Sequence, residues 1–173
     1  MLRYAVFAAL LSVALACEAF PNNTQTTFNW WQCYDSKISY FKTTPEDASG
    51  KVEYPIVLSK PLNVVADIDN KGSVYNSLTM SIRIWEWGGF LGCQWNEINT
   101  FGLLSKLDAC THGVPCPIKT GRQTLTMTID FSKFQAIIGL LKNNAPYQIE
   151  ITLKDNSSGD KTCVMAQARA LTH

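Results

Sequence analysis

Cys110-Thr-His-Gly-Val-Pro-Cys116-Pro-Ile-Lys-Thr-Gly121 is a tight cysteine loop that leads directly into an alternating strand pattern. The glycine and proline between its cysteines favour a turn, so Cys110 and Cys116 are expected to form a disulfide. Cys33 and Cys163 lie in the first and last predicted strands. We expect a second disulfide between them, because a bond that closes nearly the whole chain restricts the unfolded state most. This layout predicts an exported domain held by disulfides.

Residues 1–19 have the features of a signal peptide. Arg3 precedes an uncharged run that is too short to span a bilayer comfortably. Small residues at the positions that a signal peptidase reads give two candidate cleavage points, after Ala16 and after Ala19. We take 1–19 as the leader and 20–173 as a single domain of ordinary size, without internal repeats. The protein is therefore expected to be secreted or lysosomal.

One cysteine has no obvious partner in this arrangement. The chain has six cysteines, and cleavage after Ala19 would remove Cys17 and leave an odd number. Cys93 is then unpaired, unless Cys17 is retained or Cys93 replaces a partner in one of the two expected pairs.

The composition argues against nucleic acid as a partner and against catalysis. The formal net charge is +1 without a run of basic residues, whereas phosphate binding needs clustered Lys and Arg. The histidines are His112 and His173, and no Gly-x-Ser-x-Gly motif occurs, so no acid, base and nucleophile converge. Cys110, His112 and Cys116 fall short of the four ligands of a zinc site. We expect no enzyme, no metal and no cofactor.

Most of the chain is predicted to form short strands. Residues 78–86, 123–130 and 147–153 alternate between apolar and polar side chains, which is typical of strands with one buried face. Turn-forming residues separate the strands, for example at 69–73 and 155–160. Short strands at this spacing predict an all-β domain, either a sandwich or a barrel.

Two apolar segments interrupt the strand pattern and form the candidate site. Residues 85–104 are aromatic among glycines, although loops are normally polar, and residues 131–141 place apolar side chains at helical spacing. Both segments would fit as caps of the core. Alternatively, they line the mouth of a cavity or touch a membrane. The candidate portal residues are Trp85, Trp87, Phe90, Leu91, Trp95, Phe101, Leu103, Leu104, Phe131, Phe134, Ile137, Ile138 and Leu141.

Two sequons are candidate glycosylation sites in an exported chain. They are Asn22-Asn-Thr24 and Asn156-Ser-Ser158. Asn156 lies in a predicted exposed turn, so it is the better acceptor of the two.

These motifs, in this order, resemble the ML lipid-recognition family over roughly residues 28–171. Cys110-x5-Cys116-Pro-Ile-Lys-Thr-Gly is similar to a Cys-Pro-x-Lys-Gly region of the family, and Phe28-Asn-Trp30-x-x-Cys33 is similar to its opening motif. Residues 55–64 and 146–163 resemble segments of its ganglioside-activator members. Those members have more cysteines than this chain. The spacing between Cys110 and Cys116 instead resembles that found in the sterol carriers of the family.

The resemblance implies an immunoglobulin-like β-sandwich of two antiparallel sheets with an internal apolar cavity for lipid tails. Inward residues of 78–84, 125–129 and 149–153 would form its walls. It also implies a non-enzymatic protein that extracts a glycosphingolipid-like lipid or a phospholipid from a membrane surface. A lysosomal glycosidase or an acceptor membrane would then receive the lipid.

Two alternatives to this function stay open. One is a sterol carrier of the same family. The other is an extracellular immunoglobulin-like module that binds a protein through the same aromatic residues, since such sandwiches often present loops to partners.

Overall fold

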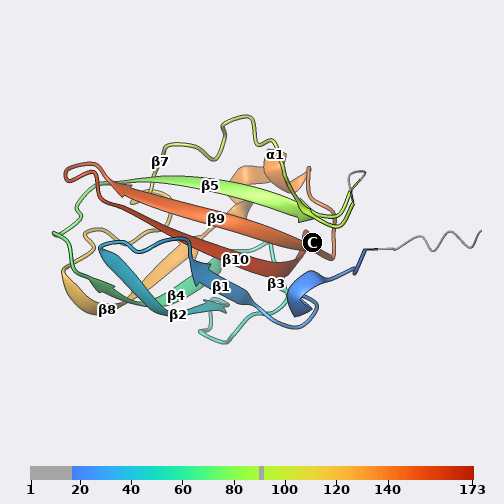
Figure 1. Ribbon diagram of the computed structural model, residues 1–173, viewed down its shortest axis with the longest axis horizontal. Coiled ribbons are helices and arrows are strands. Elements are labelled where there is room, and N and C mark those ends of the chain that lie inside the picture. Colours follow the sequence, from blue (N-terminus) through green and yellow to red (C-terminus); the bar gives the residue numbers. More distant parts are fainter. Residues whose placement is uncertain (1–16, 90–91) are drawn as a thin grey trace, which may run out of the picture.

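The computed structural model describes residues 17–89 and 92–173, which form two β-sheets that face each other across an apolar core (Figure 1). The larger sheet has the order β1-β10-β9-β5-β6, with antiparallel neighbours. Its strands are β1 (Asn29–Gln32), β5 (Leu78–Trp87), β6 (Trp95–Glu97), β9 (Ala145–Asp155) and β10 (Lys161–Leu171). The smaller antiparallel sheet consists of β2 (Ile38–Glu46), β4 (Leu62–Asn70) and β8 (Gly121–Ile129). The predicted β-sandwich is confirmed.

Short elements complete the architecture. Two strands of two residues each pair with the larger sheet. The first, β3 (Ile56–Val57), runs parallel to β10, and the second, β7 (Leu107–Asp108), runs antiparallel to β5. The helical turns are η1 (Pro21–Asn23), η2 (Phe131–Phe134) and α1 (Gln135–Ile138). In the described ranges, no helix has the length and hydropathy needed to cross a bilayer. Most of the expected leader, residues 1–16, and two candidate portal residues, Phe90 and Leu91, lie outside the described ranges.

Alternation of side chains sets the register of the larger sheet. In β5, Met80, Ile82 and Ile84 are buried, whereas Arg83 between them is exposed. Ile82 pairs with Ile151 of β9, and the two face the core together. A slip of one residue would expose the apolar face, so this pattern fixes the pairing.

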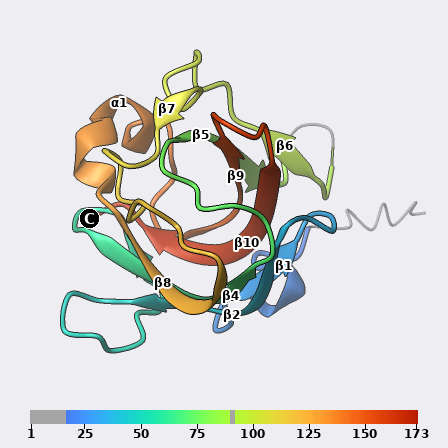
Figure 2. The same ribbon diagram turned by 90° about the vertical axis from the view of Figure 1, so that its left-hand side faces the viewer.

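The connection between β8 and β9 lies on one flank of the sandwich (Figure 2). Figure 2 shows α1 on this flank, beside β5 and β7 and above β8. The connection from β8 to β9 runs through η2 and α1, so it crosses from the smaller sheet to the larger one. This connection takes the place of a short hairpin and covers the core between the sheets.

Three disulfides join the described cysteines, and no described cysteine is free. Cys33–Cys163 and Cys110–Cys116 are the two pairs expected from the sequence. The third bond joins Cys17 to Cys93, residues 76 positions apart. It corresponds to the alternative in which Cys17 is retained.

The Cys110–Cys116 loop hydrogen-bonds to both sheets. At its start, the amide of Ala109 donates to Leu78 O in β5 at 2.9 Å, and the amide of Thr128 in β8 donates to Gly113 O at 3.0 Å. Gly113 has a φ of 101°, and a Cβ atom there would lie 1.7 Å from Thr128 O. The loop therefore needs glycine at this position, both for its conformation and for the close approach to β8.

Replacing this glycine should strongly destabilise the fold. We expect Gly113→Ala to lower the free energy of unfolding by more than about 3 kcal/mol, because a backbone clash adds to the strain of positive φ. Gly121→Ala is the matched control, since Gly121 has a φ of 85° and open space around it. It should cost only about 1–2 kcal/mol. Denaturant titration of both variants measures the difference, and equal losses would contradict a rigid contact between the loop and β8.

Candidate functional site

A cavity of about 140 Å³ lies between the two sheets. All the long strands of both sheets contribute to its walls. The larger sheet supplies Ile82, Ile84, Tyr147, Ile149, Ile151, Leu153, Val164, Ala166, Ala168 and Ala170, and the smaller sheet supplies Tyr40, Thr43, Leu62, Val64, Ala66, Leu125, Met127 and Ile129. The three strand segments expected to form walls, 78–84, 125–129 and 149–153, all contribute residues.

Small side chains on the inner face of β10 leave the space between the sheets unfilled. Val164, Ala166, Ala168 and Ala170 occupy alternate positions of this strand and all line the cavity. Packed sheets lie about 10 Å apart, and larger side chains normally fill the gap. A run of alanines on one wall therefore produces a void at a place where protein interiors are usually close-packed.

The lining of the cavity is apolar. Its polar side-chain atoms belong to Tyr40, Thr43 and Tyr147. Burial raises the pKa of Tyr40 to about 12, so its phenol is neutral at physiological pH. The hydroxyl of Tyr147 has both of its hydrogen-bond partners within the protein. It accepts from the amide of Lys142 at 2.6 Å and donates to the carbonyl of Lys142 at 3.0 Å. The cavity thus suits an apolar group without charge.

Six candidate portal residues line the cavity. Five come from η2, α1 and the turn that follows, and the sixth comes from the segment before β7. They are Phe131, Phe134, Ile137, Ile138, Leu141 and Leu104. Leu104 is held against the larger sheet, because its carbonyl accepts from the amide of Ile82 at 2.9 Å. These residues form the portal segments, which we define as 98–106 and 131–144.

The structure does not bring the three tryptophans to the cavity. The strand β5 continues through Trp87 and returns as β6 at Trp95, so residues 85–104 are not one loop as expected. With Ile84 facing inward, Trp85 and Trp87 point to the outer face of the larger sheet. The rings of Trp87 and Trp95 pack with centroids 5.2 Å apart, and the Arg83 guanidinium lies 4.7 Å from the Trp85 ring.

Two further candidates, Phe101 and Leu103, protrude from the first portal segment without lining the cavity. Their exposed fractions are 77% and 51%, and Leu140 of the second segment is 46% exposed. Single exposed apolar residues are common on protein surfaces, whereas an apolar patch often marks an interaction site. A role for them in lipid contact stays a prediction.

The second portal segment begins at a side-chain cap. The carboxylate of Asp130 accepts from the amide of Ser132 at 3.1 Å and from its hydroxyl at 2.5 Å. These hydrogen bonds from Ser132 lower the pKa of Asp130 below its ordinary value of 3.8. The cap therefore stays charged at any pH near neutrality.

The cysteine-rich groups are structural. Cys110 and Cys116 are bonded to each other, so neither offers a thiolate, and His112 Nδ1 lies 2.8 Å from the carbonyl of Asp108. Cys33, Glu150 and Cys163 also lie close together, but their sulfurs form a disulfide as well. Neither group has the ligands of a metal site.

The asparagines of both sequons are exposed, although Thr24 of the first sequon is buried, and glycosylation stays a prediction for each. The Nδ2 group of Asn22 donates to Gln167 Oε1 at 2.9 Å, and that of Asn156 donates to Ser77 Oγ at 2.9 Å. Asn22 thus contacts a buried glutamine, whereas Asn156 lies in the exposed turn between β9 and β10.

Sequence reasoning missed the walls formed by β2, β4 and β10. It also missed Phe28, Ile56, Leu58 and Tyr147, which line the cavity as well. The sequence does contain a pattern that indicates the β10 wall. Small residues recur at every second position from Ala166 to Ala170, which indicates a strand face too small to fill the space opposite it.

The chain matches one sequence family and is distantly similar to solved structures. The sequence model of the ML domain matches residues 27–170. Among solved structures, a Niemann-Pick type C2 protein from the Japanese carpenter ant is 15% identical, with 82% of this chain and 98% of that chain covered and a TM-score of 0.47. The C-terminal domain of wzt is 7% identical, with 88% and 80% covered and a TM-score of 0.41.

No curated protein matches the chain. The structural likenesses are too distant to carry an argument about function. The ML domain match, however, covers most of the chain and confirms the resemblance seen in its motifs. The protein therefore belongs to the ML domain family, a family of lipid-recognition domains.

Proposed function

We propose that this protein binds the apolar part of a lipid between its two sheets, extracts the lipid from a membrane and transfers it. The observation that carries the proposal is the apolar cavity enclosed by both sheets of an ML domain. The head group would stay outside, because the cavity walls offer it no charged partner.

The size of the cavity implies that ligand uptake opens the portal. An apolar protein cavity of about 150 Å³ holds a molecule the size of benzene. A lipid tail is larger, so the sheets or the portal segments must move to admit it. Burying a dozen methylenes yields on the order of 10 kcal/mol before the costs of association. This is ample to displace a segment whose α1 has only four residues, since such short helices have little stability of their own.

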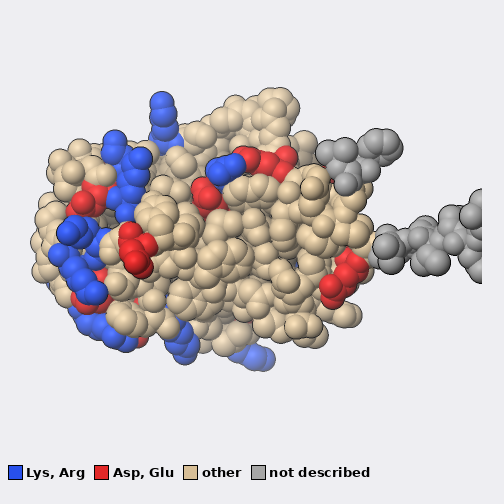
Figure 3. All heavy atoms as spheres, viewed as in Figure 1, with Lys and Arg blue, Asp and Glu red and all other residues tan. Residues whose placement is uncertain are grey.

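The portal segments are the part of the surface best suited to touch a bilayer. They expose Phe101, Leu103 and Leu140 next to the residues that line the cavity. In Figure 3, Lys and Arg gather at the end of the sandwich that carries the β9–β10 turn, away from α1. We infer that membrane contact relies on apolar insertion rather than on a large basic surface.

The ligand class that we favour is a glycosphingolipid-like lipid or a phospholipid, presented to a glycosidase or an acceptor membrane. A sterol is the alternative ligand within the same cavity. Export through the secretory pathway, to the lysosome or the extracellular fluid, agrees with the three disulfides of the described chain.

A second candidate function is a protein-binding module. Its support is the exposure of Trp31 in β1 and of Tyr34, two residues after this strand, which are 40% and 46% exposed. Aromatic side chains of this kind are common anchors in protein interfaces.

Lipid extraction from the purified protein tests the cavity directly. Organic extraction and mass spectrometry should recover a lipid from the wild type and identify it as sphingolipid, phospholipid or sterol. Ala166→Trp should lower the lipid content at least fivefold, because the new ring fills the cavity. Met165→Trp is the matched control on the opposite face of β10, and it should retain the lipid. Lipid-free wild-type protein that takes up none from vesicles would instead favour the protein-binding module.

A charged substitution tests whether the first portal segment contacts the membrane. Phe101→Asp should slow lipid transfer between vesicles about tenfold or more without changing the free energy of unfolding, because the side chain contacts little in the folded protein. Val74→Asp, at an exposed apolar residue before β5, is the control and should leave transfer unchanged. Unchanged transfer in Phe101→Asp would contradict a role for this residue at the membrane.

The Asp130 cap predicts a pH dependence of the second portal segment. Because the folded pKa is lowered, the cap stabilises the segment above the ordinary pKa of 3.8 and is lost as the pH falls through the lowered value. Amide hydrogen exchange of residues 131–138, corrected for intrinsic rates, should stay constant from pH 7 to about 4.5 and rise below that. Asp130→Ala should show the fast rate at every pH, whereas Asp130→Asn keeps an acceptor and should stay slow. A fast rate in wild type at neutral pH would contradict the cap.

A further inference from the structure

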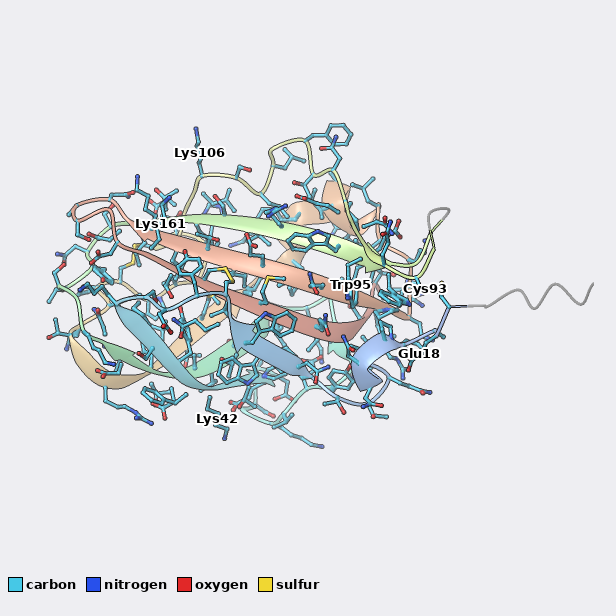
Figure 4. All side chains as sticks on the ribbon, in the orientation of Figure 1. Glu18, Lys42, Cys93, Trp95, Lys106 and Lys161 are labelled. Atoms are coloured by element: carbon cyan, nitrogen blue, oxygen red, sulfur yellow. A yellow bond between two sulfur atoms is a disulfide. The ribbon has the colours of Figure 1, made fainter. Side chains whose placement is uncertain are left out.

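The N-terminal segment of the described chain is fastened to the end of the β5–β6 hairpin. Cys17 forms its disulfide with Cys93, which lies in the turn between these two strands. Next to it, the indole Nε1 of Trp87 donates to the carbonyl of Glu18 at 2.8 Å. Figure 4 shows Glu18, Cys93 and Trp95 gathered at this end of the molecule.

The same segment also packs on β10. The guanidinium of Arg169 lies 5.6 Å from the ring of Phe20, and its Nη1 donates to the carbonyl of Gln25 at 3.3 Å. Asn22 contributes the hydrogen bond to Gln167, a β10 residue that is only 4% exposed. The segment thus joins the edge hairpin of the larger sheet to a central strand of that sheet.

Burial shows that the segment is part of the folded domain. Thr24 is fully buried, with its hydroxyl donating to the carbonyl of Pro21 at 2.7 Å, and Pro21 is buried as well. The hydroxyl of Tyr54, next to β3, donates to the carbonyl of Thr24. Buried hydrogen-bonded groups of this kind are costly to remove.

We propose that residues 17–27 are a strap that the processed protein retains, and that the leader is removed between Ala16 and Cys17, which makes Cys17 the first residue. Ala14 and Ala16 supply the small residues that a signal peptidase reads. Cleavage after Ala19 would instead remove Cys17 and the acceptor of Trp87. It would also leave Cys93 as a lone thiol in an oxidising compartment.

The two covalent steps balance with the reagents of the secretory pathway. Hydrolysis of the Ala16–Cys17 peptide bond consumes one water and leaves a carboxylate on Ala16 and a free amino group on Cys17. The thiols of Cys17 and Cys93 then lose two protons and two electrons to the disulfide of an oxidising protein, which becomes a dithiol. The proposal does not depend on lipid binding.

Characterisation of the secreted wild-type protein tests the processing site without any variant. The 173-residue chain is expressed through the secretory pathway of a eukaryotic cell, and the product is analysed by N-terminal sequencing, thiol titration in denaturant and non-reducing peptide mapping. We expect the chain to begin at Cys17, to have no reactive thiol and to yield a Cys17 peptide bonded to a Cys93 peptide. A chain that begins at Phe20 with one reactive thiol, or a Cys17 peptide bonded elsewhere, would overturn the proposal.

Two variants test whether the strap holds the hairpin. Cys17→Ser should give one thiol per molecule, at Cys93, and raise amide exchange at Gly88 and Ile98 at least tenfold, because these amides donate across the hairpin to Gln94 O at 2.9 Å and to Ile84 O at 2.8 Å. Val74→Asp, at an exposed residue that precedes the other end of β5, is the control and should leave these two amides unchanged. Equal exchange in Cys17→Ser and wild type would show that the bond does not restrain the hairpin.

Discussion

The contact of the Cys110–Cys116 loop with both sheets is the constraint on which the cavity depends. Protein interiors are close-packed, and a sandwich with an alanine-lined wall would gain van der Waals contact by closing its void. Backbone hydrogen bonds from the loop to Leu78 and Thr128 fix the spacing of the sheets at one flank. The Cys33–Cys163 disulfide ties β10 to the chain that follows β1. The loop therefore holds the sheets apart at this flank, around an interior that is left partly empty.

Much of the fold was predictable because alternation and burial agree in the central strands. Apolar residues recur at every second position in 78–84 and 147–153, and this pattern indicates both the strands and the side chains that face inward. The extent of β5 was not predictable in this way. Glycines follow Trp87, and an aromatic run beside glycines is compatible with a loop as well as with a strand end. Only the pairing of Trp87 with Trp95 determines that these rings lie on the outer face.

The partner of Cys93 shows why pairing cannot be read from spacing alone. Local sequence favours two cleavage points equally, and only the folded arrangement brings Cys17 beside the hairpin turn. A similar reason explains why some candidate portal residues line the cavity and others do not. Helical spacing located the 131–141 face that lines the cavity, because that face is short and continuous. The residues of 85–104 belong to a strand, a turn, a second strand and a loop, so no single period describes them.

The hydroxyl of Tyr147 restrains the second portal segment beside the cavity. It hydrogen-bonds to both the amide and the carbonyl of Lys142, which attaches the C-terminal end of the second portal segment to β9. At the other end, the Asp130 cap holds the start of the segment next to β8. A segment held at both ends moves outward only in its middle. Under the proposed lipid-binding function, an opening made in this way would be narrow, because both of its ends stay in place. On this proposal, the width of the ligand would then limit its entry more than its length does.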